Sequence, residues 1–352
     1  MNPSSALLSP ILSWYDLPIT MTSRRKFMQA AAGTLAASAQ AQSGDLDRLL
    51  AIPGPGRVRA VLDTDTYNEI DDQYAVAYSL LSPERLSIEA IYAAPFVNNR
   101  SPSAAVGMEK SYEEILRLLG FFPDANASTV FRGSSQFFER KGRPVESPAA
   151  RDLIEKALQP SDELLYVLTI GCPVNVSSAI LMEPAIKEKI VVVWLGGTTH
   201  YWPSASEFNL RQDVIASQVL FDSGVPLVQI PTKNVSEHLK TTASELEQFL
   251  RGRSRIGDYL YGQFLQYQAG RTKGRNRGFP YSKVIWDISA IAWLNNPEWV
   301  PSEIVPSPVL TDDMRWESSA GRHNIRVANN CNRDLVFNDV FLRLASLKDL
   351  DV

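Results

Sequence analysis

The sequence VLDTDTYNEIDDQYA, residues 61–75, decides the fold class of this chain and indicates where its functional site lies. An apolar segment ends at Leu62, a helical pattern begins near Asp72, and five acidic residues fall at this junction: Asp63, Asp65, Glu69, Asp71 and Asp72. Proteins of the α/β class bind ligands where strands end and helices begin. Carboxylates this close repel one another unless a cation lies among them. Ligands that are all oxygen atoms favour a hard cation, Ca²⁺ or Mg²⁺.

One or two of these aspartates could have a purely structural role. Aspartate is common at the first turn of a helix, where it accepts backbone N–H bonds and faces the positive end of the helix dipole. A cap needs only one residue, and Asp63 ends an apolar run in which an unpaired charge would be costly. The cluster therefore favours a metal or catalytic site.

The composition fits an enzyme of ordinary size. The chain has 352 residues, of which 45% are hydrophobic, enough to bury a large α/β core. Its formal net charge of −4 gives no electrostatic reason to expect nucleic acid or an anionic membrane as a partner. The two cysteines, Cys172 and Cys331, form neither a disulfide framework nor a zinc motif.

The N-terminal region has the pattern of an export signal. Residues 23–28, SRRKFM, precede a short Ala-rich stretch, and Ala39-Gln40-Ala41 has the small-x-small pattern of a cleavage site. We expect a twin-arginine signal peptide at residues 21–41, an upstream extension at residues 1–20, and the folded domain at residues 42–352. The stretch is too short for a stable membrane anchor. A periplasmic or secreted protein is expected.

Strand and helix signals alternate along the rest of the chain. Strands are predicted at Val58–Leu62, Ser87–Ala93, Ser128–Phe131, Leu164–Ile170, Ile190–Leu195 and Val225–Ile230. Helices are predicted at Asp72–Leu81, Met108–Leu119, Ala149–Leu158, Val174–Met182 and Ile288–Leu294. Continuously apolar strands separated by helices indicate a parallel sheet covered on both faces. We therefore expect a single Rossmann-like α/β domain with a central, mainly parallel sheet flanked by helices.

Polar residues follow several of these strands, at the edge where parallel sheets carry their functional loops. Asn98 and Asn99 follow the second strand, and Gly196-Gly197 precedes the segment HYWPSASEFN. Trp286-Asp287 begins a late apolar helix. Taken alone, Asp287 would be read as an N-cap and either asparagine as a turn residue.

Taken together, these motifs resemble a known family. The acidic loop, Ile170-Gly171 followed by Pro173 and Asn175, the triplet Glu207-Phe208-Asn209 and the pair Trp286-Asp287 are similar, in this order, to calcium-dependent nucleoside hydrolases of the inosine-uridine preferring type. The resemblance extends from about Val58 onward. It implies an enzyme that hydrolyses the N-glycosidic bond of ribonucleosides and that forms dimers or tetramers.

The resemblance also assigns roles to individual positions. The calcium ligands would be Asp65, Asp72, Asp287 and the main-chain carbonyl of Ile170, with Asp65 also the general base for a calcium-bound water. The ribose hydroxyls would be bound by Asp71, Glu207 and Asn209, assisted by Asn98 or Asn99. Such a site suits the reaction, because positive charge develops on the sugar in the transition state and nearby carboxylates stabilise it.

Two features depart from the family pattern. The segment between Asp65 and Asp71 is two residues longer than usual and contains Glu69. Trp286 stands where many members have a histidine, as in the purine-preferring branch, and could stack on the base together with Trp202 and Tyr201. His200 could protonate the leaving base, although a lone histidine is more often structural.

Two other functions fit part of the sequence. Asp63-Thr64-Asp65-Thr66 matches part of the nucleophile loop of haloacid dehalogenase-like phosphatases, with Lys233 or Lys283 as the lysine of that site. The Asp71-Asp72 pair and the Glu-Phe-Asn triplet would have no role there. The other is an exported protein that binds a ribosyl ligand without cleaving it, against which the intact Asp65 argues.

Overall fold

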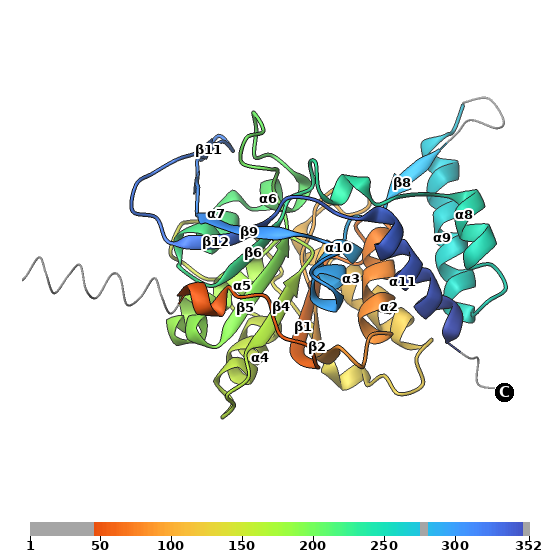
Figure 1. The fold of residues 1–352 in the computed structure, drawn as a ribbon, viewed down its shortest axis with the longest axis horizontal. Helices are drawn as coiled ribbons and strands as arrows, with labels where there is room; N and C mark the ends of the chain where they lie inside the picture. The colour runs from red at the N-terminus through yellow and green to blue at the C-terminus, as the bar shows by residue number, and fades with distance from the viewer. Residues whose placement is uncertain (1–45, 275–280, 348–352) are drawn as a thin grey trace, which may run out of the picture. The chain divides into compact units, whose positions relative to one another are not determined.

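The structure, a computed structural model, describes residues 46–274 and 281–347. Its centre is an eight-stranded sheet in the order β3-β2-β1-β4-β5-β6-β12-β9 (Figure 1). All neighbouring strands in it are parallel except β12 and β9, which are antiparallel. These strands are β1 (Val58–Thr64), β2 (Leu86–Ala93), β3 (Val130–Arg132), β4 (Leu165–Thr169), β5 (Ile190–Leu195), β6 (Leu227–Ile230), β9 (Ser302–Pro306) and β12 (Asn324–Ala328). The predicted α/β class with a mainly parallel sheet is confirmed.

Helices connect the strands and cover both faces of the sheet. They are α2 (Asp71–Leu80), α3 (Ala104–Leu119), α4 (Pro148–Leu158), α5 (Val174–Met182), α6 (Phe208–Gln212), α7 (Val214–Asp222), α8 (Ala243–Phe249), α9 (Arg255–Arg271), α10 (Ile288–Asn295) and α11 (Arg333–Ser346). Each predicted helix is present. The start of α3 lies before the predicted Met108, because the Ser103 hydroxyl accepts a bond from the Val106 N–H and caps the helix there.

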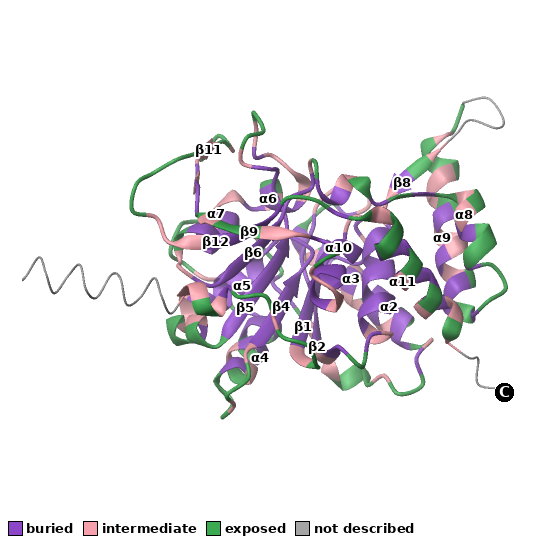
Figure 2. Cartoon of the chain, in the orientation of Figure 1, coloured by how far each residue is buried: buried purple, intermediate pink, exposed green. Residues whose placement is uncertain are grey.

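The alternation of side chains along each strand divides the core into two layers. In β1, Ala60 and Leu62 pack with apolar residues of α2, α10 and α11, whereas Val61 packs with those of α4, α5 and α7. Figure 2 shows the strands buried between these layers and the outer faces of α8 and α11 exposed. Burial on both faces explains why the central strands are continuously apolar.

Parts of the fold were not predicted from the sequence. These are α6, α7, α8, α9 and α11, the antiparallel edge formed by β9 and β12, and two small antiparallel pairs. The pairs are β7 (Lys240–Thr242) with β8 (Ser282–Val284), and β10 (Val309–Leu310) with β11 (Trp316–Glu317).

The predicted signal peptide and upstream extension, residues 1–41, lie outside the described residues. Within residues 46–274 and 281–347, none of the helices combines the length and apolar character required to cross a bilayer.

Candidate active site

A cavity of about 340 Å³ lies where the carboxyl ends of β1, β4 and β5 meet the first turns of α2 and α10. Its lining includes predicted site residues from four separate segments of the chain: Asp65, Asp71, Asp72, Ile170, Glu207, Asn209, Trp286 and Asp287. A volume of this size is at the lower end of the range for small-molecule sites. Thr198, Ser206, Arg211 and Thr232 also line it and were not predicted, although Thr198 and Thr232 follow the ends of β5 and β6.

The register of the sheet brings the acidic loop and Ile170 together. Asp63 lies opposite Thr169 in the parallel pair of β1 and β4, and the Ile170 N–H donates to the Asp63 carbonyl at 2.8 Å. A side chain at the next residue would be crowded, because a Cβ atom at Gly171 would lie 3.2 Å from both the Asp65 carboxyl carbon and the Asp65 nitrogen, closer than most Cβ contacts. The Ile170-Gly171 motif therefore allows two strand ends to approach closely.

Asp287 reaches the same cavity from the far end of the chain. It occupies the N-cap position of α10, but in the described structure its side chain makes no capping bond. One carboxylate oxygen from each of Asp71, Asp72 and Asp287 lies within 4.8 Å of the others, and all three residues are buried. The simple N-cap interpretation of Asp287 is therefore wrong, and the carboxylate is available to the cavity.

Burial of these carboxylates disfavours their charged forms. Burial, assisted by the charge of Asp71, raises the pKa of Asp72 to about 7. Burial and the neighbouring Asp72 raise the pKa values of Asp65 and Asp287 well above the usual range. Without a cation, these neighbouring buried carboxylates therefore destabilise the folded protein.

The donor groups fit a hard divalent cation. Both carboxylate oxygens of Asp65 are buried and have no hydrogen-bond partner within the described part of the chain. Asp72 accepts one bond, from the Thr64 hydroxyl at 2.6 Å. The Ile170 carbonyl accepts a bond from the Asn209 amide at 2.9 Å and keeps a second lone pair. A cation held by Asp65, Asp72, Asp287 and the Ile170 carbonyl would satisfy oxygens that the fold leaves without partners.

Asp71 is bound differently from the other aspartates. Its Oδ1 lies 3.2 Å from the Lys283 ammonium and accepts from the Ile70 N–H at 3.3 Å. Its Oδ2 accepts from the Trp286 N–H at 3.3 Å. Burial raises the pKa of Asp71, and the charge of Lys283 opposes that shift.

Glu207 and Asn209 belong to the N-terminus of α6. The Glu207 carboxylate caps the helix by accepting from the N–H groups of Asn209 and Leu210, and it also accepts from the Gly197 N–H at 3.1 Å. The Asn209 amide donates to the carbonyls of Ile170 and Leu195. The triplet thus ties the loops after β4 and β5 to α6 around the cavity.

Five residues that were considered for binding the sugar or the base lie apart from this cavity, among them Tyr201, which is 69% exposed. Asn98 and Asn99 line a neighbouring polar cavity of about 530 Å³, in which the Asn98 amide donates to the Asn68 side chain at 2.7 Å. The side chain of Trp202 is 42% exposed. His200 bonds to Gln229 at 2.8 Å and contacts the Trp316 ring. The structure thus brings Trp286 to the cavity, but among the residues it describes neither Asn98, Asn99, Trp202 nor His200 forms part of the lining.

The phosphatase interpretation does not fit the position of Asp63. Its side chain is fully buried and accepts from the Asn175 amide at 2.8 Å. Asp63 does not line the acidic cavity in the described structure, so it cannot act there as a nucleophile. Burial raises its pKa to about 7.

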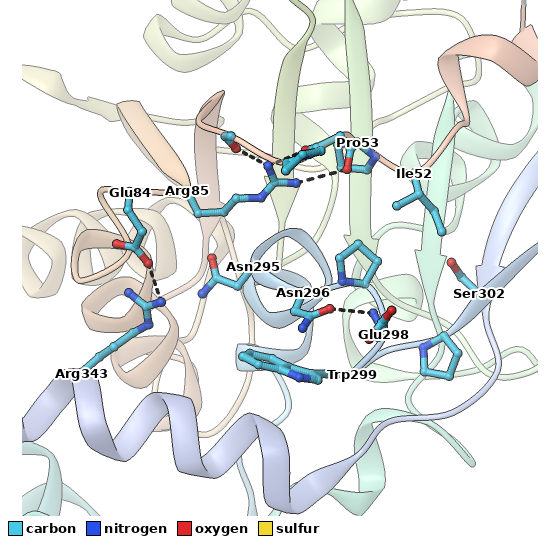
Figure 3. A pocket seen from close by; sticks show the side chains of 15 residues that line it. Ile52, Pro53, Glu84, Arg85, Asn295, Asn296, Glu298, Trp299, Ser302 and Arg343 are labelled. Atoms are coloured by element: carbon cyan, nitrogen blue, oxygen red, sulfur yellow. Dashed lines mark hydrogen bonds and ion pairs between the residues drawn. The ribbon is translucent and has the colours of Figure 1, made fainter.

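A larger cavity of about 890 Å³ lies near the amino ends of β1 and β2, away from the aspartates (Figure 3). Arg85 extends along one wall and donates to the backbone carbonyls of Gly54, Gly56 and Leu294. Glu84 pairs with Arg343. The charged groups labelled at this wall are largely satisfied by the protein itself, unlike those of the acidic cavity.

A parallel sheet whose strand ends gather buried aspartates around a ligand-sized cavity defines an α/β enzyme with an oxygen-lined, cation-compatible site. Comparison with known proteins narrows this class. Residues 60–338 match the family described as inosine-uridine preferring nucleoside hydrolase, and the chain belongs to this family. It is a nucleoside hydrolase, an N-glycosyl hydrolase.

Individual relatives agree with this assignment. The chain is 27% identical over 251 residues to the pyrimidine-specific ribonucleoside hydrolase RihA of Salmonella paratyphi A, an alignment that covers 65% of this chain and 77% of the relative. A purine-preferring ribonucleoside hydrolase from Gardnerella vaginalis shares the fold with a TM-score of 0.65 at 19% identity, covering 82% of this chain and 98% of the other. A plant nucleoside hydrolase does so with a TM-score of 0.64 at 20% identity, covering 83% and 100%.

Proposed function

We propose that this enzyme hydrolyses ribonucleosides to free base and ribose, that Ca²⁺ is its cation, and that Asp65 is the general base. The observation that carries the proposal is the buried, unpartnered carboxylate of Asp65 beside Asp72 and the Ile170 carbonyl. The family is metal-dependent, and every donor at this site is an oxygen atom, which suits calcium.

The residues of the cavity have distinct roles in this proposal. A bound cation would lower the pKa of a nearby water and orient it towards the sugar. Asp65 accepts the proton of that water. The remaining negative charge of the cluster stabilises the positive charge that develops on the sugar ring. Asp71 and Asn209 bind sugar hydroxyls, and this binding energy helps to distort the ring at the reacting carbon.

Trp286 supports a preference for purines within this proposal. It is half-buried in the cavity wall and next to Asp287, so its ring can contact the departing base. RihA is named as pyrimidine-specific and the Gardnerella vaginalis enzyme as purine-preferring, so the base has to be decided by measurement on this protein.

The test is the release of ribose from inosine, adenosine, guanosine, uridine and cytidine by the purified protein. We expect hydrolysis that a chelator abolishes and that Ca²⁺ restores. Asp65→Ala should lower kcat by about 10³-fold or more, because loss of a general base alone removes about 10²–10⁴-fold. Asp63→Asn is the matched control, since this carboxyl lies outside the cavity and should leave chelator-sensitive turnover in place. Ribose release from none of the five nucleosides would contradict the proposal.

A further inference from the structure

Lys283 is a buried cation between two carboxylates, Glu69 and Asp71, that line the acidic cavity. Its side chain is 7% exposed, and its ammonium lies 2.7 Å from Glu69 Oε2 and 3.2 Å from Asp71 Oδ1. It also donates to the Val284 carbonyl at 2.8 Å. Three acceptors match the three donors of an ammonium group, so the position of Lys283 is fully specified.

The ion pair between Lys283 and Asp71 indicates that Asp71 has a different role from Asp65 and Asp72. Lys283, Ile70 and Trp286 supply three donors to the Asp71 carboxylate, which has about four lone-pair sites. One site remains, on a residue that lines the cavity. A single remaining acceptor suits a hydroxyl group of the substrate, whereas the unpartnered oxygens of Asp65 suit a cation.

Glu69 makes this arrangement compatible with the reaction. A lone ammonium would cancel the charge of Asp71 and would oppose positive charge on the sugar. Glu69 balances the ammonium, so Lys283, Glu69 and Asp71 together keep one net negative charge. Arg271 also pairs with Glu69, but its side chain is 59% exposed and solvent screens its charge. Glu69 is itself held by the Tyr267 hydroxyl at 2.6 Å and by Arg271 at 3.3 Å, both from α9. Glu69 lies in the longer segment between Asp65 and Asp71, so the two extra residues have a structural explanation.

We propose that Lys283, balanced by Glu69, is a positioning residue that holds Asp71 against a hydroxyl of the sugar and thereby sets the selectivity for ribosyl over deoxyribosyl substrates. This inference rests on the proposed function. Lys283 acts through Asp71 and does not touch the reacting atoms.

The test compares kcat/KM for inosine with kcat/KM for 2′-deoxyinosine and 3′-deoxyinosine. The wild-type enzyme should prefer inosine over at least one of the two deoxy substrates by roughly tenfold or more, the size expected for a hydrogen bond to a charged group. In Lys283→Met this ratio should fall by roughly tenfold, chiefly through loss of activity on inosine. Glu69→Gln keeps the contact between Lys283 and Asp71, so it should keep the ratio within about threefold while kcat falls.

Lys156→Met is the matched control. Lys156 is also a partly buried lysine, 17% exposed and paired with Asp152 at 3.0 Å, but it lies on α4 away from the cavity. Lys156→Met should leave the ratio of kcat/KM for inosine to kcat/KM for each deoxy substrate unchanged. If Lys283→Met does not fold, Lys283→Gln replaces it and should give an intermediate ratio, because an amide can still donate to Asp71.

The outcomes separate this inference from the proposed function. A folded Lys283 variant that loses activity equally on all three substrates would overturn the positioning role and leave the proposed function intact. If the wild-type protein binds inosine without cleaving it, the proposed function fails, and the same ratio is read from dissociation constants by calorimetry. A wild-type protein that neither binds nor cleaves inosine would overturn both the proposed function and this inference.

Discussion

At the scale of single residues, the aspartates of the acidic loop differ in how completely the protein satisfies them. Asp63 bonds to Asn175, Asp71 is surrounded by three donors, Asp72 has the Thr64 hydroxyl, and Asp65 has no hydrogen-bond partner among the described residues. Since a buried carboxylate without partners is costly, Asp65 has the greatest need of a cation, whereas Asp63, whose Oδ2 also lacks a partner, differs by lying outside the lining of the cavity.

The raised pKa of Asp72 predicts a specific dependence of stability on pH. In the folded protein this carboxyl titrates near 7, and in the unfolded chain near 3.8. Its contribution to stability is therefore fully present below pH 3.8 and is lost as the pH rises through 7. Between pH 5 and 8, the cation-free wild type should lose up to about 3 kcal/mol more unfolding free energy than Asp72→Asn. Urea unfolding in the presence of a chelator measures this difference.

Calcium provides the control for that measurement. At pH 8, Ca²⁺ should raise the midpoint of unfolding of the wild type, because a ligand that binds only the folded state stabilises it. The rise should be much smaller for Asp72→Asn, because this variant replaces the negatively charged carboxylate of one proposed ligand by a neutral amide. Equal pH profiles for the two proteins would contradict a role for Asp72 in the electrostatic cost of the cluster.

The sequence predicted the residues whose place follows from sheet geometry. Asp65, Ile170 and Asp287 were expected at one site because of the resemblance to the family, and sheet geometry agrees, since they follow strands or begin helices whose ends meet at one edge of a parallel sheet. Asn98 and Trp202 were expected there too, but they lie in loops, and a loop's path is not specified by strand order. Lys283 was considered only for a phosphatase site, because its contact with Asp71 depends on the pairing of β7 with β8.

At the scale of elements, α6 is a helix of one and a half turns that depends on its cap. The Glu207 carboxylate accepts from two N–H groups of α6 and one of the loop after β5, so most of its hydrogen-bonding capacity is used inside the protein. Its position is therefore set by local structure, even though it faces the cavity.

Glu207→Ala should destabilise the protein by about 1–2 kcal/mol, the usual cost of removing an N-cap. Calcium affinity should change by less than threefold, because Glu207 is not among the proposed cation ligands. Urea unfolding and calorimetric titration with Ca²⁺ measure the two quantities on the same sample. A large loss of calcium affinity with unchanged stability would show that the carboxylate serves the cation and not the helix.

The elements that were not predicted share a dependence on distant contacts. The sequence of α9, RIGDYLYGQFLQYQAGR, contains three glycines, which disfavour helix, and it is stabilised by burial of Ile256, Leu260 and Phe264. The strand β12 pairs with β6 and β9, neither of which adjoins it in sequence. Local patterns predicted most of the helices and strands that form successive βα units, although not α6 and α7 between β5 and β6, and missed the elements whose formation needs the finished core.

At the scale of the whole molecule, the cation site joins the start of α2 to the start of α10, two helices that also pack together in one core layer. A cation bound here would couple ligand binding to folding, as is usual where a site is assembled from distant segments. Such coupling suits a protein exported by the twin-arginine route, which carries chains that are already folded.

We propose on this basis that residues 21–41 direct export. Arg24→Lys together with Arg25→Lys should retain the protein in the cytoplasm, whereas Lys26→Arg, a change of the adjacent basic residue, should not. Immunoblots of periplasmic and cytoplasmic fractions measure the distribution. Equal amounts in the periplasm for the paired variant and the wild type would contradict export by this signal.

The segment that leads from β8 into α10 has a consequence for how this enzyme can diverge. Five consecutive residues, 283–287, contain Lys283, Trp286 and Asp287. Lys283 pairs with Asp71, the Trp286 N–H also donates to Asp71, and Trp286 and Asp287 line the cavity. Inserting or deleting one residue here would displace the Trp286 ring and the Asp287 carboxylate in a single event. Relatives with this architecture should therefore vary here by substitution and keep the length of the segment constant, while changes of length accumulate in loops that carry one function each.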